Sequence, residues 1–194
     1  MNIERPKPKY EIPENAKKVF TGIIFDVYQW EQELYDGSTT IFEKIKRPDT
    51  VVIYPVLPDG KIMLIEEEQP GRIPHIGIPG GRVDEGEDIL LAAKRELHEE
   101  TGYEAEEYIL WDAQQPELRL EWAVYTFIAK GLKKTSEPHT DAGEKIKIMP
   151  VNFDELIEIT TTGNFSEREA TFKFLEAKYD KVKREELKEL FKPI

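Results

Sequence analysis

The hydrophobic pattern of this sequence changes its period at Asp88, and this change limits the fold more than any other feature. Before Asp88, segments rich in β-branched and aromatic residues are typical of strands, and residues 36–37 and 59–60 carry hairpin turn signals. After it, apolar residues recur three and four positions apart up to Gly102. This spacing predicts an amphipathic helix that ends at a glycine.

The second half of the chain alternates strand and helix signals. We expect a helix over residues 151–159 and one longer helix from Ser166 to about Leu190, begun by a capping box between Ser166 and Glu169. The strands are expected at residues 108–112, 122–132 and 145–151. This order predicts an α+β fold in which helices pack on a mixed sheet.

Composition restricts the partners and the metal. With 27 Lys and Arg against 39 Asp and Glu, the formal charge is -12, which opposes binding to nucleic acid. The chain has no Cys and only three His, so a metal site would use oxygen ligands, which favours Mg²⁺ or Mn²⁺. No stretch is long and apolar enough to span a membrane, and no signal peptide is evident, so we expect a cytoplasmic protein.

Three glutamates gather near the end of the predicted helix. At about 100° per residue, Glu96 and Glu100 lie roughly 40° apart, and Glu99 lies roughly 60° to the other side of Glu96. Such crowding raises the pKa of each carboxyl unless cations lie among them, which suggests a site for hard divalent ions. The alternative is a solvated face, with counter-charge from Lys94 and Arg95.

The residues around this helix also follow a longer pattern of glycine, arginine and glutamate. Its positions are Gly81, Glu87, Arg95-Glu96-Leu97, Glu99-Glu100, Gly102 and Tyr103. This pattern resembles the Nudix box. Every polar and glycine position of that box is filled, and Tyr103 stands where an aliphatic residue is usual.

The resemblance implies the Nudix fold, an α/β/α sandwich with a mixed sheet between helices. It implies that Glu96 and Glu100 are the principal metal ligands, that Glu99 assists, and that the carbonyl of Gly80 completes the site. Arg95 would orient the glutamates.

Two further glutamates have roles by the same resemblance. Glu87 would support the site, either through a salt bridge to Arg95 or by a direct part in catalysis. The loop that contains Asp141 and Glu144 resembles the one that supplies the general base in ADP-ribose pyrophosphatases, so Glu144 is our candidate base. Glu99 is the alternative base.

Substrate contacts are expected outside the box. By the resemblance, Phe42 would stack on the base with Phe25 near its companion position, although a phenylalanine in a strand is usually a core residue. Arg47 and Arg72 would contact the nucleotide, and Arg72 lies in a Pro/Gly-rich loop. Gly77 stands where many ADP-ribose enzymes have a glutamate, so a substrate contact is expected to be lost there.

The segment before the predicted domain resembles the region through which ADP-ribose pyrophosphatases dimerise. We therefore expect an N-terminal arm and antiparallel β extension over residues 1–48, a Nudix domain over residues 49–194, and a homodimer.

The resulting hypothesis is Mg²⁺-dependent hydrolysis of a nucleoside diphosphate sugar, with ADP-ribose giving AMP and ribose 5-phosphate. The alternatives are another sugar such as GDP-mannose, a nucleoside triphosphate pyrophosphatase, and a non-catalytic module that senses nucleotide sugars. The C-terminal helix could dock a partner or pack on its own domain.

Overall fold

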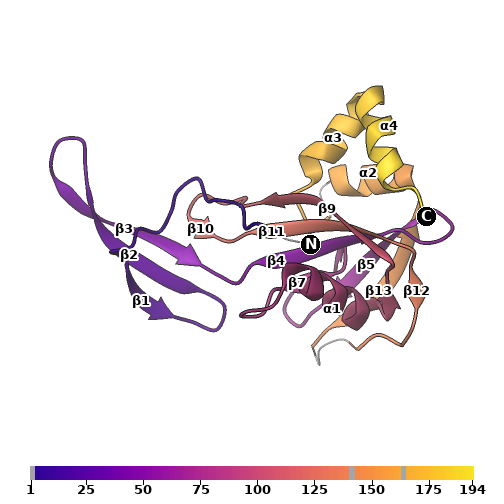
Figure 1. Cartoon of the computed structure of the whole chain (residues 1–194), viewed down its shortest axis with the longest axis horizontal. Helices are drawn as coiled ribbons and strands as arrows, with labels where there is room; N and C mark the ends of the chain where they lie inside the picture. Colours follow the sequence, from indigo (N-terminus) through magenta and orange to yellow (C-terminus); the bar gives the residue numbers. More distant parts are fainter. Residues whose placement is uncertain (1–2, 140–142, 163–164) are drawn as a thin grey trace.

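The computed structural model describes residues 3–139, 143–162 and 165–194. Figure 1 shows a layered domain with an N-terminal extension projecting from it. The helices are α1 (Ile89–Thr101), α2 (Phe153–Thr161), α3 (Thr171–Tyr179) and α4 (Lys181–Leu190). The strands are β1 (Lys17–Thr21), β2 (Asp26–Glu33), β3 (Thr39–Lys46), β4 (Thr50–Pro55), β5 (Ile62–Glu68), β6 (His75–Gly77), β7 (Gly80–Arg82), β8 (Tyr103–Glu104), β9 (Glu107–Gln114), β10 (Leu120–Glu121), β11 (Val124–Lys130), β12 (Lys133–Lys134) and β13 (Lys145–Val151).

The centre of the domain is a mixed sheet in the order β7-β4-β11-β9. Strands β4 and β11 pair in parallel, whereas β7 and β9 are antiparallel to their neighbours. A second sheet, β13-β5-β6, lies beside it. Helix α1 covers one side of the strands, and α2, α3 and α4 cover the other (Figure 1). The predicted α/β/α sandwich is therefore confirmed.

Strand β4 contributes to hydrophobic cores on both faces of the central sheet. Val51 and Ile53 pack in the core beneath α1, whereas Val52 and Tyr54 pack in the core beneath α2, α3 and α4. A strand that is buried on both faces reads as a continuous hydrophobic run instead of an alternating one. This accounts for the unbroken apolar stretch in the sequence.

Both predicted turns are present, but they differ in what they join. The turn at residues 36–37 connects β2 and β3, which pair along their whole length. The turn at residues 59–60 is flanked by a single bridge between Val56 and Ile62, and β4 and β5 belong to different sheets. The second turn therefore joins two layers.

Helix α1 begins and ends as the sequence predicts. The side chain of Asp88 caps it by accepting hydrogen bonds from the backbone N–H groups of Leu90 and Leu91. Gly102 ends it in the left-handed conformation, with φ 74°, and donates its N–H to the carbonyl of His98. These two residues fix where the glutamates of α1 lie.

The prediction of one long C-terminal helix is wrong, because Asp180 divides it. Asp180 has an extended backbone, and its side chain caps α4 by accepting from the N–H groups of Val182 and Lys183. A side chain that can cap a new helix competes with continuation of the old one. Both helices pack on their own domain, with Phe174 of α3 and Leu187 of α4 buried in its core.

The predicted capping box between Ser166 and Glu169 is also wrong. Helix α3 begins after Ala170, which makes no side-chain cap. The backbone N–H of Ser166 instead donates to the carbonyl of Ile76 in β6 at 2.9 Å. The segment before α3 therefore belongs to the sheet edge.

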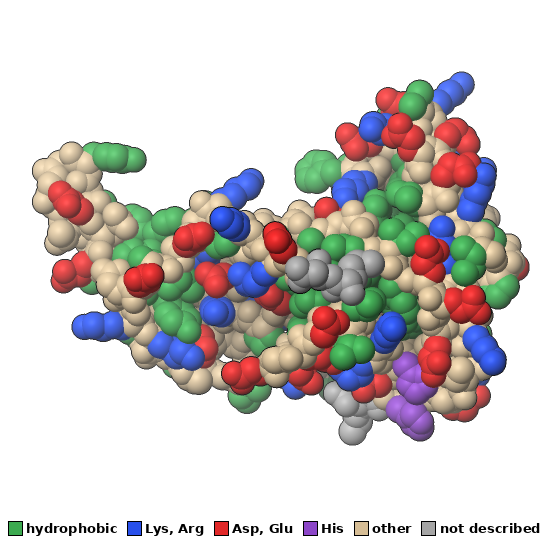
Figure 2. All heavy atoms as spheres, viewed as in Figure 1, with side chains coloured by type: hydrophobic (Ala, Val, Ile, Leu, Met, Phe, Trp, Pro, Cys, Tyr) green, Lys and Arg blue, Asp and Glu red, His purple; other side chains and the backbone are tan. Residues whose placement is uncertain are grey.

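The N-terminal extension is a sheet in the order β1-β2-β3-β10. Its last strand, β10, comes from the second half of the chain and pairs in parallel with β3. The arm before β1 is held at this joint, because Arg5 pairs with Asp49 and the buried Lys44 donates to the carbonyl of Tyr10. Figure 2 shows hydrophobic side chains exposed over the extension.

Within the described residues, no helix has the length and apolar character needed to cross a membrane.

We predict that Gly102→Ala destabilises the protein more than Gly37→Ala. Both glycines have positive φ, so alanine costs roughly 1–2 kcal/mol at each. At Gly102 the new Cβ would also collide with the backbone carbonyl of Ser136, whereas nothing lies within 4 Å of the one at Gly37. Thermal unfolding should give a Tm loss of about 2–8 °C for Gly37→Ala and a clearly larger one for Gly102→Ala. Equal losses would contradict the close approach at Gly102.

Candidate active site

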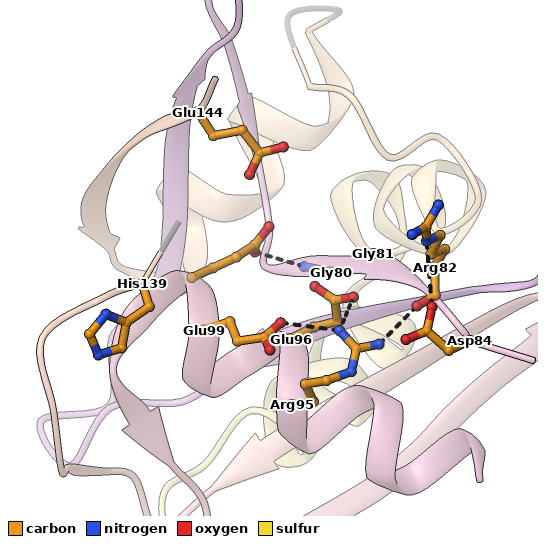
Figure 3. Close-up of a pocket in the computed structure, with 10 residues that line it drawn as sticks. Gly80, Gly81, Arg82, Asp84, Arg95, Glu96, Glu99, His139 and Glu144 are labelled. Atoms are coloured by element: carbon orange, nitrogen blue, oxygen red, sulfur yellow. Dashed lines mark hydrogen bonds and ion pairs between the residues drawn. The ribbon is translucent and has the colours of Figure 1, made fainter. Parts of the chain in front are cut away.

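The glutamates of α1 face strand β7 across a narrow gap. Figure 3 shows Arg95, Glu96 and Glu99 projecting from α1 toward Gly80 and Gly81, with Glu144 approaching from the opposite side. A Cβ on Gly81 would lie 2.5 Å from Oε1 of Glu96, so any larger residue there would displace this carboxylate. The glycine of the box therefore leaves the space that the Glu96 carboxylate occupies.

Arg95 organises the acidic side chains around it. Its Nε and Nη2 donate to the two carboxylate oxygens of Glu87, both at 2.9 Å. Its Nη1 donates to Glu96 at 2.7 Å and to Glu99 at 3.1 Å, and Nη2 also reaches the carbonyl of Arg82 at 3.0 Å. One guanidinium thus ties three carboxylates to the loop after β7.

Glu100 lies in a different environment from its neighbours. Its Oε2 accepts a hydrogen bond from the backbone N–H of Gly80 at 3.0 Å. Burial raises the pKa of Glu100 to about 9 and also raises the pKa of Glu96, whereas hydrogen bonding to Arg95 lowers the pKa of Glu87. Glu87 is therefore ionised and paired, and Glu100 is a buried carboxyl that a cation would stabilise in its charged form.

The chemistry of these donors fits a hard divalent cation. Glu96, Glu99, Glu100 and the backbone of Gly80 all line one cavity and offer only oxygen ligands. Among the described residues, no three acidic or imidazole side chains are already gathered as a metal-binding group. Arg95 binds one oxygen of Glu96 and one oxygen of Glu99, so a cation would bind the other oxygen of each carboxylate.

Two adjoining cavities form the cleft. The first, of about 530 Å³, is lined by the glutamates of α1, by Glu144 and by His139. The second, of about 440 Å³, shares Glu100 and Glu144 with the first and extends along Arg47 and Arg72. The predicted metal-site residues and both predicted arginines thus line one continuous cleft.

Glu144 lies at the junction of the two cavities, where its Oε1 accepts a hydrogen bond from Gln69 at 2.8 Å. Arg72 donates to the same glutamine at 3.1 Å. Asp141, which we placed in the same loop, lies outside the described residues. Gln69 therefore connects the candidate base with a candidate phosphate ligand.

Arg47 is held in place by aromatic rings. Its guanidinium carbon lies 4.9 Å from the ring centre of Trp122 and 5.9 Å from that of Phe25. Its Nε is buried and has no hydrogen-bond partner among the described residues. Burial also lowers the pKa of Arg47. A buried N–H without a partner costs free energy, and an anion or another acceptor that enters the cleft would remove this cost.

The two predicted aromatic contacts occupy different places. Phe25 lies against Arg47, beside the cleft. Phe42 packs edge to face on Trp30 in the N-terminal sheet, with 6.2 Å between ring centres, and does not belong to the described lining of either cavity. Stacking of Phe42 on a base stays a prediction.

Several cleft residues carried no sequence signal of function. Trp122, His75 and Glu167 line the second cavity, and Arg82 and Asp84 line the first. They come from segments far apart in the chain, and neither Trp122 nor Glu167 belongs to a recognisable motif. Only their position in the fold brings them to the cleft.

Comparison with known proteins settles the family. The NUDIX domain profile matches residues 46–174 of this chain. The chain belongs to the Nudix family. The resemblance of the box is thereby confirmed, and with it the assignment of this chain to the Nudix hydrolases.

Individual relatives agree with this assignment. The methanol dehydrogenase activator of Bacillus methanolicus is 30% identical over 147 residues, which cover 74% of this chain and 79% of the relative. The ADP-ribose pyrophosphatase of Bacillus subtilis is 29% identical with the same coverage. A crystal structure of an ADP compounds hydrolase matches with a TM-score of 0.71 and 21% identity over 97% of each chain, which supports the Nudix fold.

We predict that Glu87→Gln destabilises this Nudix protein at neutral pH but not in acid. The folded-state pKa of Glu87 is lowered, so its stabilisation is present above the ordinary glutamate pKa of about 4.3 and disappears as the pH falls through the lower folded value. With chelator present, Glu87→Gln should cost roughly 1–2 kcal/mol at pH 7. Denaturant unfolding across pH measures this difference.

The control is Glu85→Gln, which removes the same charge from an exposed residue two positions away. It should leave the free energy of unfolding nearly unchanged. A cost for Glu87→Gln that stays constant as the pH falls would rule out the ion pair with Arg95 as its source.

Proposed function

We propose that this Nudix hydrolase cleaves the diphosphate of a nucleoside diphosphate sugar with Mg²⁺ bound, and that ADP-ribose, giving AMP and ribose 5-phosphate, is its best substrate. One observation carries the proposal. The cavity lined by the glutamates of α1 continues into a cavity lined by Arg47 and Arg72. A metal site next to basic side chains suits a diphosphate, and the name of the Bacillus subtilis relative supports the choice of ADP-ribose.

We assign the metal site to Glu96 and Glu100, with Glu99 assisting and the carbonyl of Gly80 as a further ligand. Mg²⁺ is the expected ion, and Mn²⁺ has the same ligand preference. When bound, such an ion neutralises the diphosphate and lowers the pKa of a coordinated water. The burial that raises the pKa of Glu96 and Glu100 supports this assignment, because a cation would offset it.

Arg95 and Glu87 act as positioning residues in this proposal. Arg95 donates to Glu96 and Glu99 and keeps their carboxylates on the cleft side of α1. Glu87 accepts two hydrogen bonds from Arg95 and so fixes the plane of the guanidinium. Neither side chain has to touch the substrate.

We assign Glu144 as the general base that takes the proton of the attacking water. It lines both cavities, close to where the diphosphate would lie. Glu99 is the alternative base, and one oxygen of its carboxylate accepts a hydrogen bond from Arg95 at 3.1 Å.

The nucleotide contacts follow from the second cavity. Arg72 and the unpartnered Nε of Arg47 would bind phosphate oxygens. Phe25 would hold Arg47 in its orientation, since the two side chains are in contact. Phe42 would reach a base only from the N-terminal extension.

The expected result of a substrate panel is hydrolysis of ADP-ribose with Mg²⁺, faster than that of ADP-glucose, GDP-mannose or deoxynucleoside triphosphates.

Glu100→Gln should lower kcat/KM by more than about 100-fold and raise the Mg²⁺ concentration needed. Glu144→Gln should lower kcat by about 100- to 10,000-fold without changing the Mg²⁺ requirement. Chromatographic measurement of AMP formation gives the rates of the parent, Glu100→Gln and Glu144→Gln.

Other results would replace the proposal. Turnover of triphosphates alone would make the protein a nucleoside triphosphate pyrophosphatase. Binding of ADP-ribose without hydrolysis would make it a sensing module. Full activity of Glu100→Gln would remove the metal site from α1.

We further propose that residues 1–48 form a dimerisation segment attached to a Nudix domain over residues 49–194. One face of the extension carries a cross-strand row of Phe20, Val27 and Ile45, with Ile41 on the same face of β3 four residues before Ile45. Phe20 and Ile41 are each 58% exposed. Exposed apolar side chains gathered on one sheet face favour burial against a second copy.

Light scattering after size exclusion should therefore report a dimer for the parent and a monomer for Ile41→Lys. The lysine would place a charge on the face that carries the apolar row, where burial would cost several kcal/mol. Thr40→Lys is the matched control, because its side chain points to the opposite face of β3 and should leave the dimer intact. A dimer that survives Ile41→Lys, or a monomeric parent, would exclude this face as the interface.

A further inference from the structure

Glu167 lies on the segment between α2 and α3 and lines the second cavity of the cleft. This segment is attached to β6, the edge strand of the second sheet. Phe165 forms a parallel bridge with Ile76, and Ser166 donates its backbone N–H to the carbonyl of Ile76 at 2.9 Å. The attachment delivers the side chain of Glu167 to the chain just before Gly80.

The carboxylate of Glu167 occupies space that Gly77 leaves open. A Cβ on Gly77 would lie 2.9 Å from Oε2 of Glu167, so any larger residue there would displace the carboxylate. In this position Oε2 accepts the N–H of Ile78 at 3.2 Å, and Oε1 accepts the hydroxyl of Ser166. The sequence predicts that a substrate contact is lost at Gly77. In the structure, the carboxylate of Glu167, from another segment, lies at this place.

Glu167 retains unused hydrogen-bonding capacity. A carboxylate has about four acceptor positions, and the contacts with Ile78, with Ser166 and with its own backbone N–H use three of them. None of the ion pairs in the described part of the chain includes Glu167. Burial raises the pKa of Glu167 to about 7, as expected for a carboxyl without a cationic partner.

The charge of Glu167 restricts what it can bind. A carboxylate repels a diphosphate but accepts hydrogen bonds from neutral hydroxyl groups. Its partner Ile78 is two residues from Gly80, at the proposed metal site, and Glu100 and Glu144 line the same cavity. In a nucleoside diphosphate sugar, the groups that directly adjoin the diphosphate are the two sugars, whereas the base lies farther away.

We propose that Glu167 is a specificity-determining residue that accepts hydrogen bonds from the hydroxyl groups of a sugar adjoining the diphosphate. This inference rests on the proposed function and adds to it the part of the substrate that is recognised. The cleft then binds different parts of the substrate through side chains of opposite charge. Arg47 and Arg72 bind the anionic phosphates, and Glu167 binds the neutral hydroxyls.

A purely structural role is the competing explanation. A carboxylate before a helix stabilises its N-terminus, and the bond to Ile78 could only hold the backbone that leads to Gly80. If Glu167 has only these structural roles, its substitution would lower stability or would lower activity equally for every substrate. Recognition of hydroxyls predicts an effect that depends on which hydroxyls the substrate carries.

The test compares parent, Glu167→Ala and Glu167→Gln on three diphosphates with Mg²⁺. They are ADP-ribose, the methyl ester of ADP, which lacks the distal sugar, and ADP-ribose without the adenosine 2′- and 3′-hydroxyls. Glu167→Ala should lower kcat/KM for ADP-ribose about 10- to 100-fold, mainly through KM. Glu167→Gln should lose less, because its amide oxygen still accepts hydrogen bonds from Ile78 and from hydroxyls.

The control is Glu176→Gln, which removes the same charge from the exposed side of α3 and should leave kcat/KM unchanged. The effect of Glu167→Ala should shrink below threefold on one of the two truncated substrates, and that substrate identifies the sugar. Equal losses on all three substrates, or none, would overturn the proposal. Failure of the parent to hydrolyse any of them would instead refute the proposed function, and this inference with it.

Discussion

Glu87, Glu96 and Glu99 would repel one another if they were held this close without a cation among them, and the guanidinium of Arg95 supplies that charge. The same guanidinium reaches the carbonyl of Arg82, so it also fixes the loop after β7 against the helix. The spacing of α1 and β7, and therefore the width of the cleft, depends on this one side chain. Glu100 alone remains outside its reach and bonds to Gly80.

The layered fold explains why distant segments meet at this cleft. Parallel pairing of β4 and β11 puts Thr50 beside Val124, so Trp122, just before β11, lies near the start of β4 and donates to the hydroxyl of Thr50. Antiparallel pairing of β5 with β13 brings Gln69 to Glu144. The two sheets provide a fixed frame, and the residues that line the cleft stand at the ends of their strands.

Features that depend on residues close together in the sequence could be predicted, whereas features that depend on contacts between distant segments could not. The start of the helix at Asp88, its stop at Gly102 and the grouping of Glu96, Glu99 and Glu100 follow from spacing along one helix, and all are present. The break at Asp180 was missed because the apolar pattern continues across it, while a competing cap decides the outcome. Glu167 and Trp122 could not be found, because their position in the cleft depends on pairings between segments far apart in the chain.

The N-terminal arm has a mechanical consequence. Arg5 binds Asp49, the carbonyl of Pro6 accepts a hydrogen bond from Gln115, and the carbonyl of Tyr10 accepts one from Lys44. Asp49 also accepts the N–H of Ala123, so the arm is fastened to both strands that leave the joint. These contacts brace the joint between the extension and the Nudix domain. A displacement of the extension would therefore also move the start of β4, where Thr50 lines the cleft.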